Sequence, residues 1–203
     1  MDYEITFKNN SKEVVFLIDK DPNLKSLFEN KSEIKVKVSV DYYQSLVQTI
    51  IAQQLSTRVA DIIYNRLLEL LNNQIDPFNI LNTSDDQLRD IGLSRPKIKY
   101  LKSLAKHIDD KEILFEKFDS MTDEEIINQL TEVKGIGIWT AQMFLMFSMG
   151  RKDVFSTLDL GLRNALKQLL NRPEMTHKEI EAYSQKWIPY RSYVSHFLWH
   201  SWD

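Results

Sequence analysis

The sequence predicts an all-α fold, and the pattern at its N-terminus is compatible with a short β element. Apolar residues recur at positions i, i+3, i+4 and i+7 in segments 43–51 and 62–71, the spacing of one helix face. Capping boxes, in which Ser or Thr is followed three residues later by Glu or Gln, occur at Ser84, Thr122 and Thr176. These two patterns together favour helices from about residue 40 to the C-terminus.

The elements follow one another along the chain with few ambiguous stretches. Glu4–Phe7 and Glu13–Ile18 alternate or run β-prone, so a short hairpin is compatible with them, whereas Val36–Val40 is ambiguous. Gly92 and Gly150 stand where helix C-caps belong. The expected helices lie near residues 22–29, 41–53, 56–73, 84–91, 95–109, 122–132, 138–149, 160–171, 177–187 and 191–201.

Composition limits the chemistry that the chain can support. Of 203 residues, 43% are hydrophobic and 27% are charged, as in a globular protein with a full core. The absence of cysteine excludes disulfides, thiolate zinc sites, a cysteine nucleophile and iron–sulfur clusters. His196 and His200 share a helix face without an evident acidic partner, so we do not expect a metal there. Neither a membrane-spanning run nor a signal peptide is recognisable, so we expect an intracellular protein.

Net charge gives no indication of a nucleic-acid partner. The formal charge is −3, so a DNA-binding surface would have to be local, built from main-chain donors and a few cations. The segment 89–106 is locally basic, but such a run is more often a solvated helix face.

Two of the five glycines stand one residue apart, between a capped helix and an apolar helix. Gly135 and Gly137 allow a tight turn with positive φ and leave main-chain N–H groups accessible to a phosphate. These donors would lie at the N-terminus of the following helix, whose positive end attracts anions. An ordinary turn between helices would use the same residues, so the pair alone leaves both interpretations open.

Several motifs follow one another in a consistent order and spacing over roughly residues 22–202. They are Gly135–Ala141, Asp153–Gly161, Ile50–Ser56, Gly92–Lys97, and Trp187–Tyr193 with Trp199. Together they resemble the helix-hairpin-helix DNA glycosylase superfamily, most closely its 3-methyladenine DNA glycosylase II branch. The resemblance implies a two-lobed helical bundle that forms a single unit over residues 1–203. The lobes would be approximately 41–150, which contains the hairpin 122–149, and 1–40 plus 151–203.

The resemblance places the catalytic carboxylate at Asp159. From the residues alone, Asp159 is also a candidate N-cap for the helix that begins at Leu160. The two roles are compatible, because a helix N-terminus stabilises an ionised carboxylate. Asp153 is the alternative carboxylate, at a position that the resemblance marks as non-catalytic. In the implied reaction the carboxylate stabilises a cationic sugar while the damaged base leaves.

The resemblance also implies how the damaged base is held. Trp139 and Trp199 match base-pocket positions, with Tyr43, Met143 and Tyr190 as weaker candidates. Core packing is the alternative explanation for Trp139 and for the three weaker candidates. Trp139 stands where lyase-competent members carry a lysine nucleophile, so the chain resembles the monofunctional branch, which removes the base without cutting the strand.

The remaining implied contacts are with DNA. Leu55 would fill the gap that a flipped base leaves, although it would also suit the core at a turn between helices. The residues implied to contact DNA are Gln53, Gln54, Leu55, Lys134, Gly135, Gly137 and Thr140. No cofactor is expected beyond a monovalent cation, Na⁺ or K⁺, which this family holds on hairpin carbonyls. The matching main-chain oxygens are those of Thr131, Val133 and Ile136.

These patterns and the resemblance predict a monomeric, monofunctional glycosylase of base-excision repair, which acts on double-stranded DNA containing alkylated purines. We expect it in the cytoplasm, at the nucleoid of a bacterium, or in the nucleus of a eukaryote. Three alternatives stay open. A non-catalytic helix-hairpin-helix module would bind DNA without needing Asp159 and the pocket tryptophans. An all-helical scaffold protein would need neither the glycine pair nor the glutamine pair. A glycosylase for oxidised or deaminated bases would differ in its pocket residues.

Overall fold

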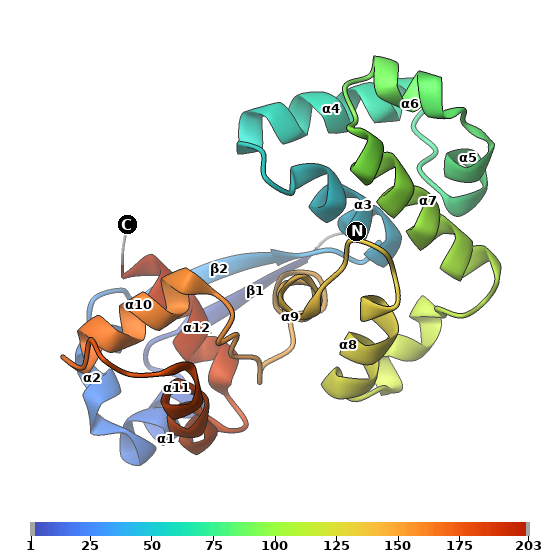
Figure 1. Ribbon diagram of the computed structural model, residues 1–203. Helices are drawn as coiled ribbons and strands as arrows, with labels where there is room; N and C mark the ends of the chain where they lie inside the picture. Colours follow the sequence, from blue (N-terminus) through green and yellow to red (C-terminus); the bar gives the residue numbers. More distant parts are fainter. Residues whose placement is uncertain (1–2, 202–203) are drawn as a thin grey trace. The chain divides into compact units, whose positions relative to one another are not determined.

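Residues 3–201 are described by a computed structural model, which is mostly helical and contains a two-stranded antiparallel sheet (Figure 1). This confirms the predicted all-α class and the β element near the N-terminus. The strands are β1 (Tyr3–Lys8) and β2 (Glu33–Val38). The α-helices are α1 (Lys12–Lys20), α2 (Lys25–Glu29), α3 (Tyr42–Ala52), α4 (Thr57–Leu70), α5 (Pro77–Asn82), α6 (Asp85–Asp90), α7 (Arg95–Asp109), α8 (Asp123–Thr131), α9 (Ile138–Phe147), α10 (Leu160–Leu169), α11 (His177–Ser184) and α12 (Arg191–His200). Short 3-10 helices lie at Pro22–Leu24, Phe115–Ser120 and Gln185–Trp187.

The chain forms two compact units. The first consists of the segment up to Val40 and the segment from Leu145 onward, and the second is Asp41–Phe144. The first unit therefore holds the sheet and α10–α12, and the second holds α3–α8. The later boundary falls within α9, whereas the sequence predicts it near residue 150. Within residues 3–201, no helix combines the length and the apolar character that a membrane crossing requires.

The two strands of the first unit pair in antiparallel register, with Tyr3 opposite Val38 and Phe7 opposite Ile34. In β2, Ile34, Val36 and Val38 are buried and alternate with exposed lysines. This is the two-residue period of a strand with one buried face. The segment that the sequence leaves ambiguous is thus a strand up to Val38.

Glu13–Ile18, expected as the second strand of an N-terminal hairpin, is instead part of α1, so this expectation was wrong. Ser11 caps the helix by accepting the main-chain N–H of Val14 at 3.4 Å. Val14 and Leu17 lie about one helical turn apart, and both are fully buried in the core of the first unit. Burying each of these side chains is worth about 1.5–3 kcal/mol, which outweighs the weak strand preference of the run.

Trp187 lies in the core of the first unit, and its side chain is fully buried. Its indole N–H donates to Oδ2 of Asp21 at 3.0 Å, and the ammonium of Lys186 lies 3.1 Å from the same oxygen. Burial alone raises the pKa of the Asp21 carboxyl, but hydrogen bonds from Trp187, Lys186 and Tyr183 hold that pKa below its ordinary value. The buried aspartate is therefore a satisfied structural group.

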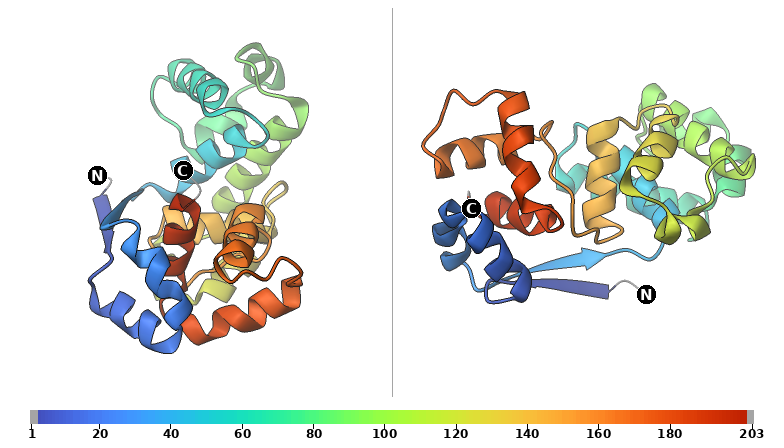
Figure 2. Two further views of the ribbon diagram at one scale, coloured as in Figure 1. Left: turned by 90° about the vertical axis from the view of Figure 1, so that its left-hand side faces the viewer. Right: turned by 90° about the horizontal axis from the view of Figure 1, so that it is seen from below.

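Helices α10 and α12 pack against each other in the first unit (Figure 2). α10 buries one face, formed by Leu162, Ala165 and Leu166. α12 is buried without interruption from Ser192 to Leu198. This packing positions the N-terminal turn of α10, where the candidate carboxylate lies.

In the second unit, α7 packs against α3, α5 and α6. Leu101 and Leu104 of α7 and Leu46 and Ile50 of α3 are fully buried. The bounds of α7 agree with the predicted helix over 95–109, which has a long apolar face. The central position of α7 makes it the support for the two turns described below.

Helix ends follow the predicted signals closely. All three capping boxes are present, at Ser84, Thr122 and Thr176. Gly92 follows α6 with a φ of 105°, as a glycine at a helix C-cap does. Helix α5 was not among the predicted helices. It nevertheless has ordinary start signals, because Asp76 caps it and a proline stands in its first turn.

His196 gives the first unit a sensitivity to acid. The side chain is buried on α12, with the ring of Phe7 at 4.4 Å and that of Phe147 at 5.4 Å. Burial, with a smaller contribution from His200, lowers the pKa of His196 from 6.5 to about 3. The imidazole of His196 is protonated below about pH 6.5 in the unfolded chain but only near pH 3 in the folded chain. The contribution of neutral His196 to the free energy of unfolding is therefore complete above pH 6.5 and is lost as the pH falls from 6.5 to 3.

We expect His196→Gln to weaken the acid dependence of stability. Between pH 6.5 and 4, the native chain should lose up to about 1.4 kcal/mol of unfolding free energy per pH unit more than the variant. Urea unfolding at a series of pH values measures this difference. His177→Gln, at an exposed position, is the control and should follow the native curve. Parallel curves for the native chain and His196→Gln would contradict the prediction.

Candidate functional site

The predicted carboxylate, Asp159, is the N-cap residue of α10. Its Oδ1 accepts the main-chain N–H of Leu162 at 2.8 Å, which satisfies a donor left open at the start of the helix. The carboxylate is thereby held at the positive end of the helix. Asp159 is half-buried, and its neighbours Leu158 and Leu160 are exposed. The N-cap geometry is compatible with the chemical role expected of this residue.

Trp199, predicted for the base pocket, lies directly beside Asp159. Its indole N–H donates to the same Oδ1 at 3.1 Å. Phe147 stacks on the indole, with ring centroids 5.2 Å apart and 28° between the ring planes. The first unit therefore brings a carboxylate and a half-buried aromatic surface together at one place.

The alternative carboxylate, Asp153, is engaged in an ion pair with Arg191 at the start of α12. The guanidinium binds both carboxylate oxygens, through Nε at 2.8 Å and Nη2 at 3.0 Å. The main-chain N–H of Arg191 also donates to Oδ1 of Asp153, at 3.1 Å. This two-pronged contact explains Asp153 as a structural residue that anchors the loop before α10.

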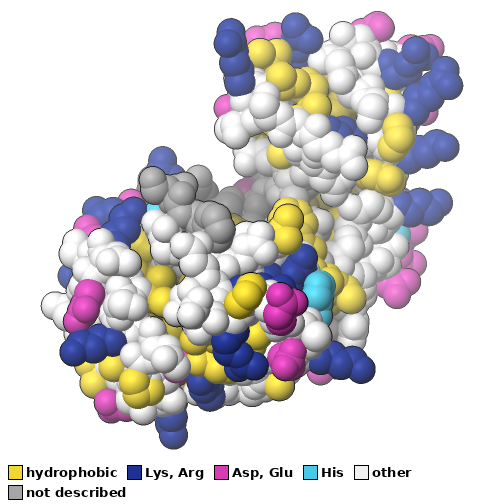
Figure 3. Space-filling view, turned by 60° about the vertical axis from the view of Figure 1, so that its left-hand side comes forward, with side chains coloured by type: hydrophobic (Ala, Val, Ile, Leu, Met, Phe, Trp, Pro, Cys, Tyr) yellow, Lys and Arg dark blue, Asp and Glu magenta, His cyan; other side chains and the backbone are white. Residues whose placement is uncertain are grey.

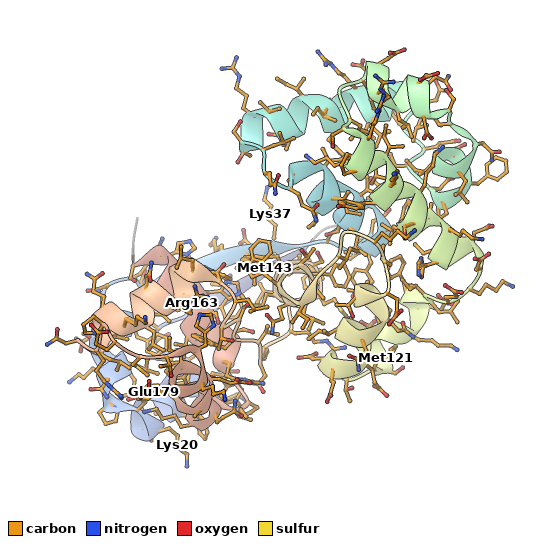
Figure 4. The ribbon with its side chains drawn as sticks, in the orientation of Figure 1. Lys20, Lys37, Met121, Met143, Arg163 and Glu179 are labelled. Atoms are coloured by element: carbon orange, nitrogen blue, oxygen red, sulfur yellow. The ribbon has the colours of Figure 1, made fainter. Side chains whose placement is uncertain are left out.

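Two serines of α12 fix the same loop. Ser192 Oγ accepts the main-chain N–H of Val154 at 2.9 Å, and Ser195 Oγ donates to the Val154 carbonyl, also at 2.9 Å. Nearer to Asp159, Arg163 donates to the carbonyl of Thr157 at 2.8 Å; Figure 4 labels this arginine on α10. Sequence reasoning missed Ser192 and Ser195, because their partner lies about 40 positions away along the chain and leaves no local pattern.

The weaker pocket candidates are largely occupied in packing. Tyr190 packs on Phe16 and Tyr193, with ring centroids 5.5 Å and 6.0 Å away. Tyr43 on α3 is buried, and this burial raises the pKa of its hydroxyl. Met143 is half-buried on α9 (Figure 4).

The N-terminal turn of α9 carries two further predicted residues. Trp139 is 42% exposed, which is unusual for so large an aromatic side chain, whereas Thr140 is buried. Core packing therefore does not account for Trp139.

The predicted hairpin joins α8 to α9 in the second unit. The N–H of Ile136 donates to the carbonyl of Val133 at 3.0 Å, and both side chains are buried, which anchors the turn. Gly135 has a φ of 88°, and a Cβ at this position would overlap the ring of Tyr100 on α7. A Cβ on Gly137 would meet no described atom within 4 Å. The two glycines therefore differ: Gly135 is needed for backbone conformation and packing, whereas Gly137 keeps open space in front of the turn.

One side of α7 supports this hairpin and the end of α3. Ser103 Oγ accepts the main-chain N–H of Lys134 at 3.1 Å, and Tyr100 packs against the hairpin one turn earlier. Lys97, a further turn back, donates to the carbonyl of Ile51 at 2.7 Å. Burial lowers the pKa of the Lys97 ammonium. Part of the basic stretch therefore has a structural role.

The predicted wedge lies on a tight turn after α3. Gln54 has a φ of 57°, and Gln54 and Leu55 are both exposed. The side-chain amide of Gln53 instead donates to the carbonyl of Gly135 at 2.8 Å. Gln53 thus ties the wedge turn to the hairpin, and the exposed residues of the turn are Gln54 and Leu55.

Charge on the second unit is mixed. Lys102 pairs with Asp85 at 2.5 Å, and Lys106 pairs with Asp110 at 2.8 Å. On the face drawn in Figure 3, Lys and Arg side chains lie among Asp and Glu side chains. Any electrostatic attraction to a polyanion is therefore local.

Metal-binding clusters are absent from the described part of the chain: no group of three His, Asp or Glu side chains is placed to hold an ion. Nδ1 of His200 lies 3.1 Å from the carbonyl oxygen of His196, an ordinary contact between successive helix turns. The carbonyls predicted for a monovalent cation belong to Thr131, Val133 and Ile136, which lie at or within the hairpin turn.

Residues 47–190 match the sequence profile of the HhH-GPD superfamily, which is described as base excision DNA repair proteins. The chain is 30% identical over 187 residues to YfjP of Bacillus subtilis, and the match covers 88% of this chain and 65% of that protein. The fold is similar to that of a DNA-3-methyladenine glycosidase from Bacillus halodurans, with a TM-score of 0.90, 34% identity, and coverage of 97% and 92% of the two chains. It is also similar to the Schizosaccharomyces pombe 3-methyladenine DNA glycosylase Mag1 in complex with abasic DNA, with a TM-score of 0.79, 30% identity, and coverage of 94% and 96%.

The different environments of the two hairpin glycines lead to different expected costs of substitution. Gly135→Ala should lower the free energy of unfolding by about 2–4 kcal/mol, because it adds a left-handed backbone penalty to the overlap with Tyr100. Gly137→Ala should change it by less than about 0.5 kcal/mol. Denaturant unfolding of both variants provides the measurement. Equal effects at the two positions would show that the assignment of their roles is wrong.

Proposed function

Because the chain belongs to the HhH-GPD superfamily of base excision DNA repair proteins, we propose that it is a monofunctional DNA N-glycosylase that removes alkylated purines from duplex DNA. The observation that carries the proposal is the carboxylate of Asp159, which caps α10 beside the indole of Trp199. Similarity to two 3-methyladenine glycosylases supports an alkylated purine as substrate. A binding module without activity would need the hairpin but not the carboxylate with its aromatic neighbour.

The chemistry follows from the charge of the substrate. A purine alkylated on a ring nitrogen is cationic, so the bond between C1′ and the base breaks with both electrons going to the base, which leaves uncharged. The deoxyribose becomes positively charged, and the Asp159 carboxylate stabilises that charge. A water oxygen then bonds to C1′ and gives a proton to the carboxylate, which leaves an abasic site.

DNA binding is assigned to the second unit. The turn around Gly137 lies at the N-terminus of α9, where main-chain N–H donors and the helix dipole favour binding of a phosphate. Lys134, exposed on the same turn, adds a cation. Leu55, exposed beside Gln54, fills the gap left by the flipped base, whose extraction costs a few kcal/mol. We assign Gln53 an indirect part in this contact, since its amide is bonded to Gly135.

The pocket assignment rests on exposed aromatic faces. A cationic base is attracted to an indole face, and Trp139 and Trp199 offer the least buried indoles among the described tryptophans. Met143 is a further candidate, whereas Tyr43 is buried within the second unit and Tyr190 packs on Phe16 and Tyr193 within the first unit. Trp139 lacks a nucleophilic amine, so we propose that the chain cannot form the Schiff base required for strand cleavage.

A monovalent cation at the hairpin is compatible with the donor set. The carbonyl oxygens of Thr131, Val133 and Ile136 are uncharged, hard ligands, as Na⁺ and K⁺ prefer. Val133 O accepts one hydrogen bond, from Ile136, and a carbonyl has a second lone pair. A bound cation would add positive charge beside the phosphate. We further propose that the protein acts as a monomer in the compartment that contains the DNA.

Replacing Asp159 with Asn tests the proposed chemistry. Asn is as good an N-cap as Asp, so the fold should persist, whereas loss of the charge should slow excision roughly 100-fold or more. The measurement is the single-turnover release of an N-methylated purine from a duplex, followed by alkaline cleavage at abasic sites. Native activity in the variant would refute the role of Asp159. Strand breaks before the alkaline step would refute the monofunctional assignment, and activity only on oxidised bases would refute the substrate class.

Asp153→Asn is the matched control, because it removes a carboxylate six residues earlier. This carboxylate pairs with Arg191, so the variant should lose about 1 kcal/mol of stability. Asn keeps one oxygen that accepts from Arg191, so the loop should stay in place and the excision rate should stay within about threefold of native. A large loss of rate in folded Asp153→Asn would contradict the distinction between the two carboxylates.

Gly137→Asp tests the hairpin as a phosphate-binding site. Asp is a favourable N-cap for α9, and nothing described lies near the new side chain, so folding should be unchanged or slightly improved. The added negative charge should weaken binding to any duplex by roughly tenfold or more. Gly137→Ser, a neutral N-cap of similar size, should bind within about threefold of the native chain. Equal affinity of all three proteins, measured by fluorescence anisotropy, would remove this turn from the DNA interface.

A further inference from the structure

Two N–H donors converge on one oxygen of the candidate catalytic carboxylate. Oδ1 of Asp159 accepts the main-chain N–H of Leu162 at 2.8 Å and the indole N–H of Trp199 at 3.1 Å. The first donor comes from the same helix, and its position is fixed by α10. The second comes from α12, 40 residues further along the chain. The orientation of the carboxylate therefore depends on where the indole is held.

The indole is held by neighbours on several sides. Phe147 stacks on it, and the ring of His196 lies 5.9 Å away at 61°. At Gly161, a Cβ would lie 3.6 Å from two atoms of the indole and only 3.1 Å from Oδ1 of Asp159. The backbone of Gly161 does not have a positive φ, so the glycine is explained by the space it leaves. The pair of side chains thus lies close against the first turn of α10.

We propose that Trp199 is a positioning residue for Asp159, and that its N–H sets the carboxylate geometry needed for glycosidic bond cleavage. The proposal rests on the glycosylase function proposed above. Two donors on Oδ1 hold that oxygen in place and so restrict the rotamer of the carboxylate. The bond from the Trp199 indole N–H to the charged Asp159 carboxylate is a strong, charge-assisted hydrogen bond. It therefore opposes rotation of the Asp159 side chain away from this position.

This role differs physically from that of a stacking surface. Stacking on a flipped base uses the face of an aromatic ring, whereas positioning uses the indole N–H. Phenylalanine keeps an aromatic face and removes the donor, so Trp199→Phe separates the two roles. A stacking role predicts little change in this variant, and a positioning role predicts a slower chemical step with unchanged binding.

The test compares native protein and Trp199→Phe in two assays, after thermal unfolding has established that the variant is folded. Single-turnover excision of an N7-methylated purine should slow roughly 10- to 100-fold, the effect of losing one hydrogen bond to a charged group. Affinity for a duplex containing an abasic-site analogue should stay within about twofold. An excision rate within about twofold of native would overturn the proposal, and so would a loss confined to binding.

A double-variant comparison decides whether Trp199 acts through Asp159. Adding Trp199→Phe to Asp159→Asn should cost less than about twofold of the residual excision rate, followed over long incubations, because the acceptor charge is already gone. The same loss as in the native background would show that Trp199 acts directly on the base, and would overturn the positioning role. Failure of the glycosylase function itself looks different: the native protein would release no base at all.

Phe147→Ala supplies a second variant in case Trp199→Phe does not fold. Phe147 is 40% exposed, so its removal should be tolerated, and it leaves the indole N–H in place but without its stacking partner. We expect a smaller loss of rate, roughly threefold to tenfold, with affinity for the abasic duplex unchanged. A native rate in folded Phe147→Ala would contradict the requirement for a clamped indole.

Discussion

The contacts between α12 and the segment 151–159 are the constraint on which the site of the first unit depends. Arg191, Ser192, Ser195 and Trp199 each bond to that segment. Because residues on one helix are spaced at a fixed rise of about 1.5 Å, the path of the bonded segment is fixed as well. A loop paired along its length has little freedom, so its terminal carboxylate is oriented before any substrate arrives.

The second unit uses α7 in a comparable way. Tyr100 and Ser103 support the hairpin, and Lys97 holds the end of α3. The amide of Gln53 then joins the turn after α3 to the carbonyl of Gly135. The two turns proposed to face DNA are therefore parts of one connected structure, which limits independent movement of either turn.

Features that depend on neighbouring residues could be predicted from the sequence, and those that depend on distant partners could not. The capping box at Thr122 and the N-cap geometry at Asp159 involve residues three positions apart, so local patterns indicated both. The choice of helix over strand at Glu13–Ile18 depended on burial against distant residues. The bond from Ser192 to Val154 spans 38 positions and leaves no local pattern. Trp199 was singled out by family resemblance, and its contact with Asp159 emerged only in the folded chain.

The packing of Tyr100 against Gly135 also restricts how the hairpin can change during evolution. A side chain at 135 must tolerate a left-handed backbone and also needs a smaller residue at 100. Either substitution alone destabilises the protein. A side chain added at 135 first would overlap Tyr100, and a smaller residue at 100 first would leave an empty space beside Gly135. A Cβ on Gly137 meets no described atom within 4 Å, so substitutions at position 137 are limited by ligand binding and not by packing. The two glycines, identical in the sequence, should therefore carry different substitution histories, with position 135 varying together with position 100.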